Sequence, residues 1–127
     1  MASQKPAGSA TGLRVLVVED EVMISMLVQD MLTELGHHVV AQATSLAEAA
    51  SLAAQADFDA ALLDVNLNGE RVDAIAETLA KRGKPFAFTT GYGERGIPLD
   101  FKDRPLLPKP YQMDQLNEIL TRVMRPA

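Results

Sequence analysis

The sequence contains neither cysteine nor tryptophan among its 127 residues, and aromatic residues make up only 5% of it. Without cysteine, the chain can form no disulfide, no thiolate metal site and no thiol nucleophile. Few aromatic rings leave few surfaces on which the bases of single-stranded nucleic acid could stack. These absences exclude disulfide scaffolds and thiol enzymes, and they argue against nucleic-acid binding.

An excess of positive charge and a long apolar run are also missing. The formal net charge is −5 at pH 7, so no broad positive field is available for nucleic acid or anionic membranes. No apolar run approaches the roughly 18 residues of a membrane-spanning helix. Residues 1–12 are small and polar, and they lack the apolar stretch of about 7 to 15 residues that marks a signal peptide. We therefore expect a disordered tail over 1–12, one domain over 13–127, a cytoplasmic location and no membrane insertion.

Short apolar segments alternate along the chain with segments of helical periodicity. Strands are predicted at 14–18, 38–42, 59–63, 85–89 and 104–107, and helical apolar spacing occurs over 24–35, 45–55, 72–79 and 116–123. The strand segments are apolar throughout rather than alternating, which is typical of a parallel sheet covered by helices on both faces. The segment 91–103 has three glycines, one proline and no apolar stripe. We therefore expect the fourth helix, which would lie there, to be short or degenerate.

Polar side chains gather at the carboxyl ends of the predicted strands, where ligands bind in open parallel sheets. These residues are Glu19, Asp20, Asp64, Thr89, Thr90 and Lys109. Three carboxylates brought together repel one another unless a cation joins them, and oxygen ligands favour Mg²⁺. Lys109 offers a compact positive charge for a phosphoryl oxygen. Only one of the two threonines can point to the site, and we expect Thr90 to do so.

Four motifs, VLVVEDE, LLDVNLNGE, FTTGYG and LPKPY, resemble the signatures of the response regulator receiver domain of bacterial two-component signalling. The resemblance implies a flavodoxin-like, doubly wound sheet of five parallel strands in the order 2-1-3-4-5. It implies that Asp64 accepts a phosphoryl group from a histidine kinase or a histidine phosphotransfer protein. It further implies that Mg²⁺ is held by Glu19, Asp20, Asp64 and the backbone carbonyl of Asn66, and that Thr90 and Lys109 bind the phosphoryl group.

Some positions depart from the usual receiver pattern. Leu106 stands where the family often has an aromatic switch residue, and Leu67-Asn68-Gly69 replaces a proline soon after the acceptor. The run from Phe88 to Gly91 resembles the atypical FAT GUY-like subgroup, with Thr89 in place of alanine. In that context Tyr92 is a candidate for admitting or screening water. Signalling through 91–103, rather than through an aromatic ring at 106, is the resulting expectation.

Three functions remain open on the sequence alone. The first is a stand-alone receiver, not an enzyme beyond slow self-dephosphorylation, which signals to an unknown downstream protein in a phosphorelay, as a monomer or a homodimer. The second is a pseudo-receiver that binds a partner without phosphorylation. The third is a phosphatase with Asp64 as nucleophile, but such an enzyme needs an acid two residues further on, where this chain has Asn66.

Overall fold

Five parallel strands form the central sheet of the computed structural model, which describes residues 12–90, 97, 101, 103–109 and 111–124. The strands lie in the order β2-β1-β3-β6-β7. Their bounds are β1 (Arg14–Val18), β2 (His38–Ala43), β3 (Ala60–Asp64), β6 (Phe86–Thr90) and β7 (Leu106–Pro108). Every neighbouring pair is parallel. The predicted fold class and strand order are therefore confirmed.

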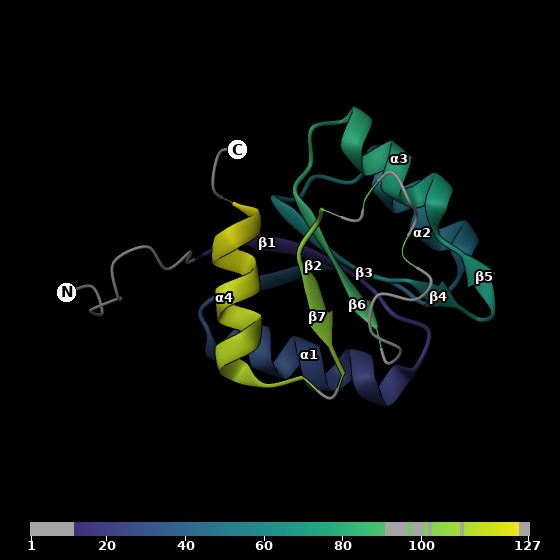
Figure 1. The fold of residues 1–127 in the computed structure, drawn as a ribbon. Helices are drawn as coiled ribbons and strands as arrows, with labels where there is room; N and C mark the ends of the chain where they lie inside the picture. Colours follow the sequence, from purple (N-terminus) through teal and green to yellow (C-terminus); the bar gives the residue numbers. More distant parts are fainter. Residues whose placement is uncertain (1–11, 91–96, 98–100, 102, 110, 125–127) are drawn as a thin grey trace.

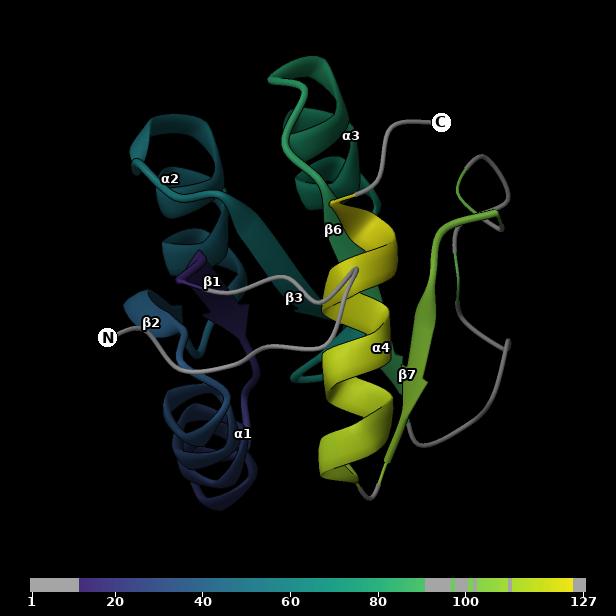
Figure 2. The same ribbon diagram turned by 90° about the vertical axis from the view of Figure 1, so that its left-hand side faces the viewer.

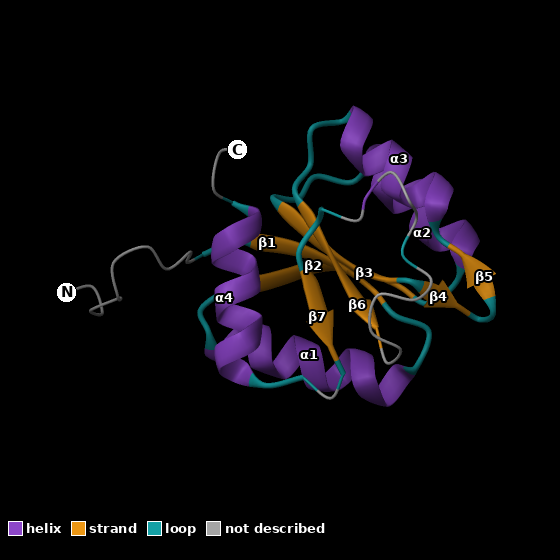
Figure 3. Cartoon of the chain, viewed as in Figure 1, coloured by secondary structure: helices purple, strands orange, loops and turns teal. Residues whose placement is uncertain are grey.

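Helices cover both faces of this sheet, as Figures 1 and 3 show. On one face lie α1 (Val22–Glu34) and α4 (Met113–Val123), and on the other α2 (Leu46–Gln55) and α3 (Asp73–Lys81). The start of α2 is capped by Ser45, whose hydroxyl accepts a hydrogen bond from the Glu48 backbone N–H at 3.2 Å. The Glu48 carboxylate reaches back to the backbone N–H of Thr44 rather than to that of Ser45.

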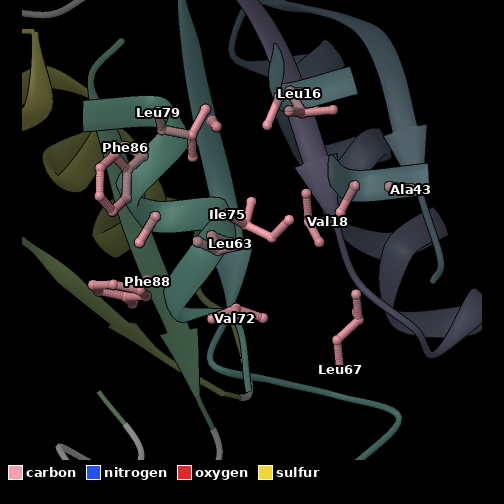
Figure 4. Close-up of a cluster of buried hydrophobic side chains, with 14 of the residues drawn as sticks. Leu16, Val18, Ala43, Leu63, Leu67, Val72, Ile75, Leu79, Phe86 and Phe88 are labelled. Atoms are coloured by element: carbon pink, nitrogen blue, oxygen red, sulfur yellow. The ribbon is translucent and has the colours of Figure 1, made fainter. Parts of the chain in front are cut away.

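Two apolar layers result from the alternation of side chains along the strands. Leu16, Val18, Leu63, Phe86 and Phe88 pack against α2 and α3 (Figure 4). The residues between them in sequence join the layer under α1 and α4; these are Val15, Val17, Leu62 and Ala87. Complete burial of such a side chain contributes about 1.5–3 kcal/mol, so this two-sided core holds the ends of the strands in fixed positions.

A small antiparallel hairpin, β4 (Asn66–Leu67) and β5 (Glu70–Arg71), follows β3 and was not predicted. Its turn has positive φ at Asn68 (54°) and Gly69 (80°), the combination that a two-residue type I′ turn requires. Figure 1 shows the hairpin beyond α2 and α3, on the side of the molecule away from α4, and Figure 2 shows α4 from its outer side. One expected core residue also differs, because Leu27 of α1 is exposed.

The connection from β6 to β7 is described only at Ile97, Phe101 and 103–105, and none of these is α-helical. Ile97 is buried, and the ring of Phe101 packs on that of Phe86 with centroids 5.8 Å apart. Tyr92 and most of 91–103 lie outside the described residues, as does nearly all of the expected tail. Gly12 already donates a backbone hydrogen bond to the Gly36 carbonyl at 3.1 Å. Over the described residues, no helix is long and apolar enough to cross a membrane.

Candidate functional site

The carboxyl ends of the strands bring four of the predicted site residues together. Glu19 and Asp20 follow β1, Asp64 ends the adjacent strand β3, and Lys109 follows β7. Glu19, Asp20 and Asp64 each offer a carboxylate oxygen, and these three atoms lie within 4.8 Å of one another. Lys109 Nζ is 2.8 Å from Glu19 Oε1 and 3.2 Å from Asp64 Oδ2. Two of these three carboxylates, those of Glu19 and Asp64, thus share one ammonium.

Asp64 is buried at the centre of this group. Its Oδ1 accepts a hydrogen bond from the Asn66 backbone N–H at 3.1 Å, and its Oδ2 accepts one from Lys109. Burial raises the pKa of Asp64 to about 7; the negative charge of Glu19 adds to the increase, while the Asn66 N–H and the charge of Lys109 oppose it. The ionised form of Asp64 is therefore poorly stabilised unless further positive charge is added.

Lys109 stays charged in spite of its partial burial. Burial by itself lowers the pKa of Lys109, but the hydrogen bond to Glu19 and the charge of Asp64 raise it by more, so the net shift is upward. The backbone N–H of Lys109 also donates to the Thr90 carbonyl at 2.8 Å. This bond fixes the position of the ammonium stem relative to the end of β6.

The two carboxylates after β1 have further donors. Glu19 Oε2 accepts from the Glu21 backbone N–H at 3.2 Å, and Glu19 Oε1 lies 3.4 Å from the Tyr111 hydroxyl. Asp20 Oδ2 accepts from the Asn68 backbone N–H at 3.0 Å. Asp20 is half-buried, so its carboxylate is reachable from solvent. Sequence reasoning did not assign a role to Tyr111 or to Asn68.

This group fits a hard divalent cation. When all three carboxylates are ionised, one ammonium leaves them with an excess of negative charge, and every nearby ligand atom of the cluster is an oxygen. Such a set suits Mg²⁺ better than a transition metal. The backbone carbonyl of Asn66 stays a predicted ligand.

Both threonines of β6 are buried at the same edge of the sheet. The strand register places Thr89 directly beside Asp64, and register partners in a parallel pair extend to the same face. Thr90 is the last residue of the strand. Its predicted role as the phosphoryl-binding hydroxyl stays a prediction.

Comparison with known proteins assigns the chain to a protein family. Residues 15–121 match the family model of the response regulator receiver domain. The transcriptional regulatory protein PdtaR of Mycobacterium tuberculosis is 32% identical over 114 residues, which cover 87% of this chain and 56% of that protein. The chain thus spans about half the length of the curated relatives it matches.

Solved structures give the same result for the fold. The solution structure of SdrG from Sphingomonas melonis has a TM-score of 0.81 and 37% identity, covering 91% of this chain and 99% of that one. The anti-anti-sigma factor PhyR from Bartonella quintana has a TM-score of 0.78 and 27% identity, covering 91% of this chain and 48% of that one.

Proposed function

Because the chain belongs to the response regulator receiver domain family, we propose that Asp64 accepts a phosphoryl group from a phosphorylated histidine and that the chain then signals by binding another protein. The donor is a histidine kinase or a histidine phosphotransfer protein. Glu19, Asp20, Asp64 and the Asn66 carbonyl hold Mg²⁺, while Thr90 and Lys109 contact the phosphoryl group. The observation that carries the proposal is the central position of Asp64 among two other carboxylates and Lys109.

In the proposed transfer, an ionised oxygen of Asp64 attacks the phosphorus of the donor. A new P–O bond forms while the P–N bond breaks, and the electron pair of the broken bond stays on the histidine nitrogen. Lys109, 3.2 Å from Asp64 Oδ2, favours the ionised acceptor and can follow the charge onto the phosphoryl oxygens. Bound Mg²⁺ would add positive charge that stabilises the carboxylates and the phosphoryl oxygens together.

The phosphatase alternative lacks a proton donor at the required position. Asn66 stands two residues after Asp64, and its Oδ1 accepts a hydrogen bond from the Gly69 backbone N–H at 2.8 Å. This side chain therefore stabilises the β4–β5 turn and carries no exchangeable acid. We propose one phosphorylation per chain, with slow hydrolysis and no turnover of phosphate esters.

A protein is the proposed partner on the output side. The net charge of −5 disfavours nucleic acid, and the name anti-anti-sigma factor given to the relative PhyR describes action through a protein. This chain covers 99% of the solved SdrG chain, so a receiver domain is the part that the two have in common. Tyr92 is proposed to control water access to the phosphorylated Asp64.

Mass spectrometry of the intact protein after incubation with acetyl phosphate and Mg²⁺ tests the proposal. We expect one phosphoryl group on the parent and none on Asp64→Asn. Asp59→Asn is a matched control. Asp59 directly precedes β3, so it lies at the opposite end of this strand from Asp64. This variant should be phosphorylated like the parent. An unmodified parent would support the pseudo-receiver instead, and repeated turnover of p-nitrophenyl phosphate would support the phosphatase.

A further inference from the structure

One oxygen of Glu19 has two competing donors. Glu19 Oε1 lies 2.8 Å from Lys109 Nζ and 3.4 Å from the Tyr111 hydroxyl. The first distance is that of a strong charge-assisted hydrogen bond, whereas the second is longer than a good O–H···O bond. Glu19 is only 1% exposed, so water cannot readily replace a donor that leaves. If Lys109 moves away, the Tyr111 hydroxyl is the nearest remaining donor to Glu19 Oε1.

Tyr111 connects this oxygen to the last helix. It lies between β7 and α4, two residues before Met113, where α4 begins. Its ring is buried in the same apolar layer as Leu116 and Leu120 of α4. Burial raises the pKa of Tyr111 to about 12, although Thr89 and Lys109 oppose the increase. The phenol therefore keeps its proton at neutral pH and can donate it in a hydrogen bond.

Thr89 supplies a second hydroxyl beside the phenol. It is 2% exposed, and its Oγ1 makes no hydrogen bond of good geometry among the described residues, although it lies near enough to the phenol to lower the pKa of Tyr111. Buried hydroxyls normally have a partner, so this one marks a place where a polar group can still be accommodated. Its strand position is directly beside Asp64. A phenol that moved toward Glu19 could accept a hydrogen bond from Thr89 while donating to Glu19.

We propose that Tyr111 is a positioning residue that takes the place of Lys109 on Glu19 when Lys109 turns to a phosphoryl group on Asp64, and that this shift of the phenol moves the start of α4. The inference rests on the proposed function of Asp64. A doubly charged phosphoryl group attracts the ammonium more strongly than one carboxylate does. Even with Mg²⁺ on the Glu19 carboxylate, Glu19 Oε1 would then lose its closest hydrogen-bond donor unless Tyr111 moves closer. Leu106 has no ring that could act instead.

Nuclear magnetic resonance with ¹³Cζ-labelled tyrosine tests this directly, because the chain has only two tyrosines and Tyr111→Phe identifies the signal. With Mg²⁺ and beryllofluoride, a phosphoryl mimic, we expect the Tyr111 ¹³Cζ signal and the amide signals of 113–118 to shift. Tyr111→Phe should still show the Asn66 amide change that reports occupancy at Asp64. Its amide shifts over 113–118 should largely disappear, and beryllofluoride should bind about three- to tenfold more weakly through the lost hydrogen bond.

A second arm needs no phosphoryl mimic. Lys109→Met removes the competing donor in the protein without added metal, so the Tyr111 ¹³Cζ signal should move in the same direction as it does with beryllofluoride. Thr121→Val is the control: it removes a hydroxyl near the far end of α4, where it bonds to the Asn117 carbonyl. This variant should respond to beryllofluoride like the parent.

The outcomes separate the two proposals. A parent whose Asn66 amide does not respond to beryllofluoride overturns the proposed function and this inference with it. A parent that responds, beside a Tyr111→Phe variant with undiminished shifts over 113–118, overturns the role of Tyr111 alone. An unmoved Tyr111 signal in Lys109→Met also overturns that role.

Discussion

The two ends of the sheet carry ion clusters with the same arrangement of charges. At the amino ends of β1 and β3, Arg14 contacts Asp57 at 2.6 Å and Asp59 at 3.0 Å. At the carboxyl ends, Lys109 contacts Glu19 at 2.8 Å and Asp64 at 3.2 Å. Each cluster is one cation between two carboxylates at similar distances. The cations differ, a guanidinium against an ammonium, but the surroundings of the two clusters differ more.

The difference is access to water. The side chains of Arg14 and Asp59 are 43% and 31% exposed, whereas those of Lys109 and Asp64 are 17% and 6% exposed. Hydrogen bonds from Arg14 lower the pKa of Asp59, but burial raises that of Asp64 to about 7. The same pairing thus stabilises an ionised acid at one end and leaves the acid at the other end poorly compensated. A poorly compensated carboxylate is one that gains from added positive charge.

The largest expected effect comes from removing the cation of each cluster. Lys109→Met should lower the free energy of unfolding by about 3 kcal/mol at pH 8, because it leaves buried carboxylates uncompensated. Arg14→Met should cost much less, because water screens the exposed pair. Urea denaturation without metal measures both. Equal losses would contradict the comparison, and saturating Mg²⁺ should restore part of the stability of Lys109→Met only.

The pH dependence of stability should have opposite signs at the two ends. Because the folded-state pKa of Asp64, about 7, lies above its ordinary value of 3.8, folding favours the protonated form. Its contribution to stability is present at low pH and is lost as the pH rises through about 7. The total is on the order of 4 kcal/mol. The lowered pKa of Asp59 gives stability at higher pH that is lost on acidification below its ordinary range.

Urea titrations with a chelator from pH 4 to pH 8 measure this difference. As the pH rises from 4 to 8, the parent should lose stability relative to Asp64→Asn. The difference in stability between Asp59→Asn and the parent should stay nearly constant until the pH approaches 4. If Asp64→Asn and the parent show the same pH profile, the acid at the carboxyl end is as well compensated as the one at the amino end.

The two clusters should also differ in their contribution to Mg²⁺ affinity, with a smaller expected effect. Asp20→Asn removes one of three convergent carboxylates and should weaken Mg²⁺ binding by about tenfold or more. Asp57→Asn, which removes an acid from the other cluster, should leave the affinity unchanged. Calorimetric titration with Mg²⁺ provides the dissociation constants. Parent-like binding by Asp20→Asn would remove Asp20 from the proposed metal site.

Much of this edge of the sheet could be predicted because it depends on local patterns. Continuous apolar runs indicate parallel strands, and the residues after them meet at one edge. The strand ends differ by a residue or two: β3 and β6 include Asp64 and Thr90, because the ladder continues through the Asp64–Thr89 pair. Strand β7 begins at Leu106, since Arg104 is held in a turn by a backbone hydrogen bond to Phe101.

Contacts between distant residues could not be predicted in the same way. The Tyr111 hydroxyl meets Glu19 across 92 positions of sequence, and only the packing of α4 against β6 and β7 decides that the phenol reaches the carboxylate. The exposure of Leu27 also depends on how elements pack. The apolar face of α1 is wider than the part of the helix that contacts the sheet, where the buried apolar residues are Val28, Met31 and Leu32. The β4–β5 hairpin is different, because Asn68-Gly69 is by itself a strong local turn signal, and the hairpin could have been predicted from it.

The β4–β5 hairpin allows a further test of the difference between the two ends of the sheet, with the smallest expected effect. Gly69 and Gly83 have φ of +80° and +70°, and a Cβ at either position would meet no atom within 4 Å. Alanine at either one should therefore cost a similar amount, about 1 kcal/mol, from backbone strain alone. Only Gly69→Ala disturbs the turn that donates the Asn68 N–H to Asp20, so it should weaken Mg²⁺ binding by about twofold through lost orientation of a ligand. Gly83→Ala, in the loop between α3 and β6, should leave that affinity unchanged. Equal Mg²⁺ affinities in both variants, at equal losses of stability, would mean that Asp20 is oriented without the hairpin.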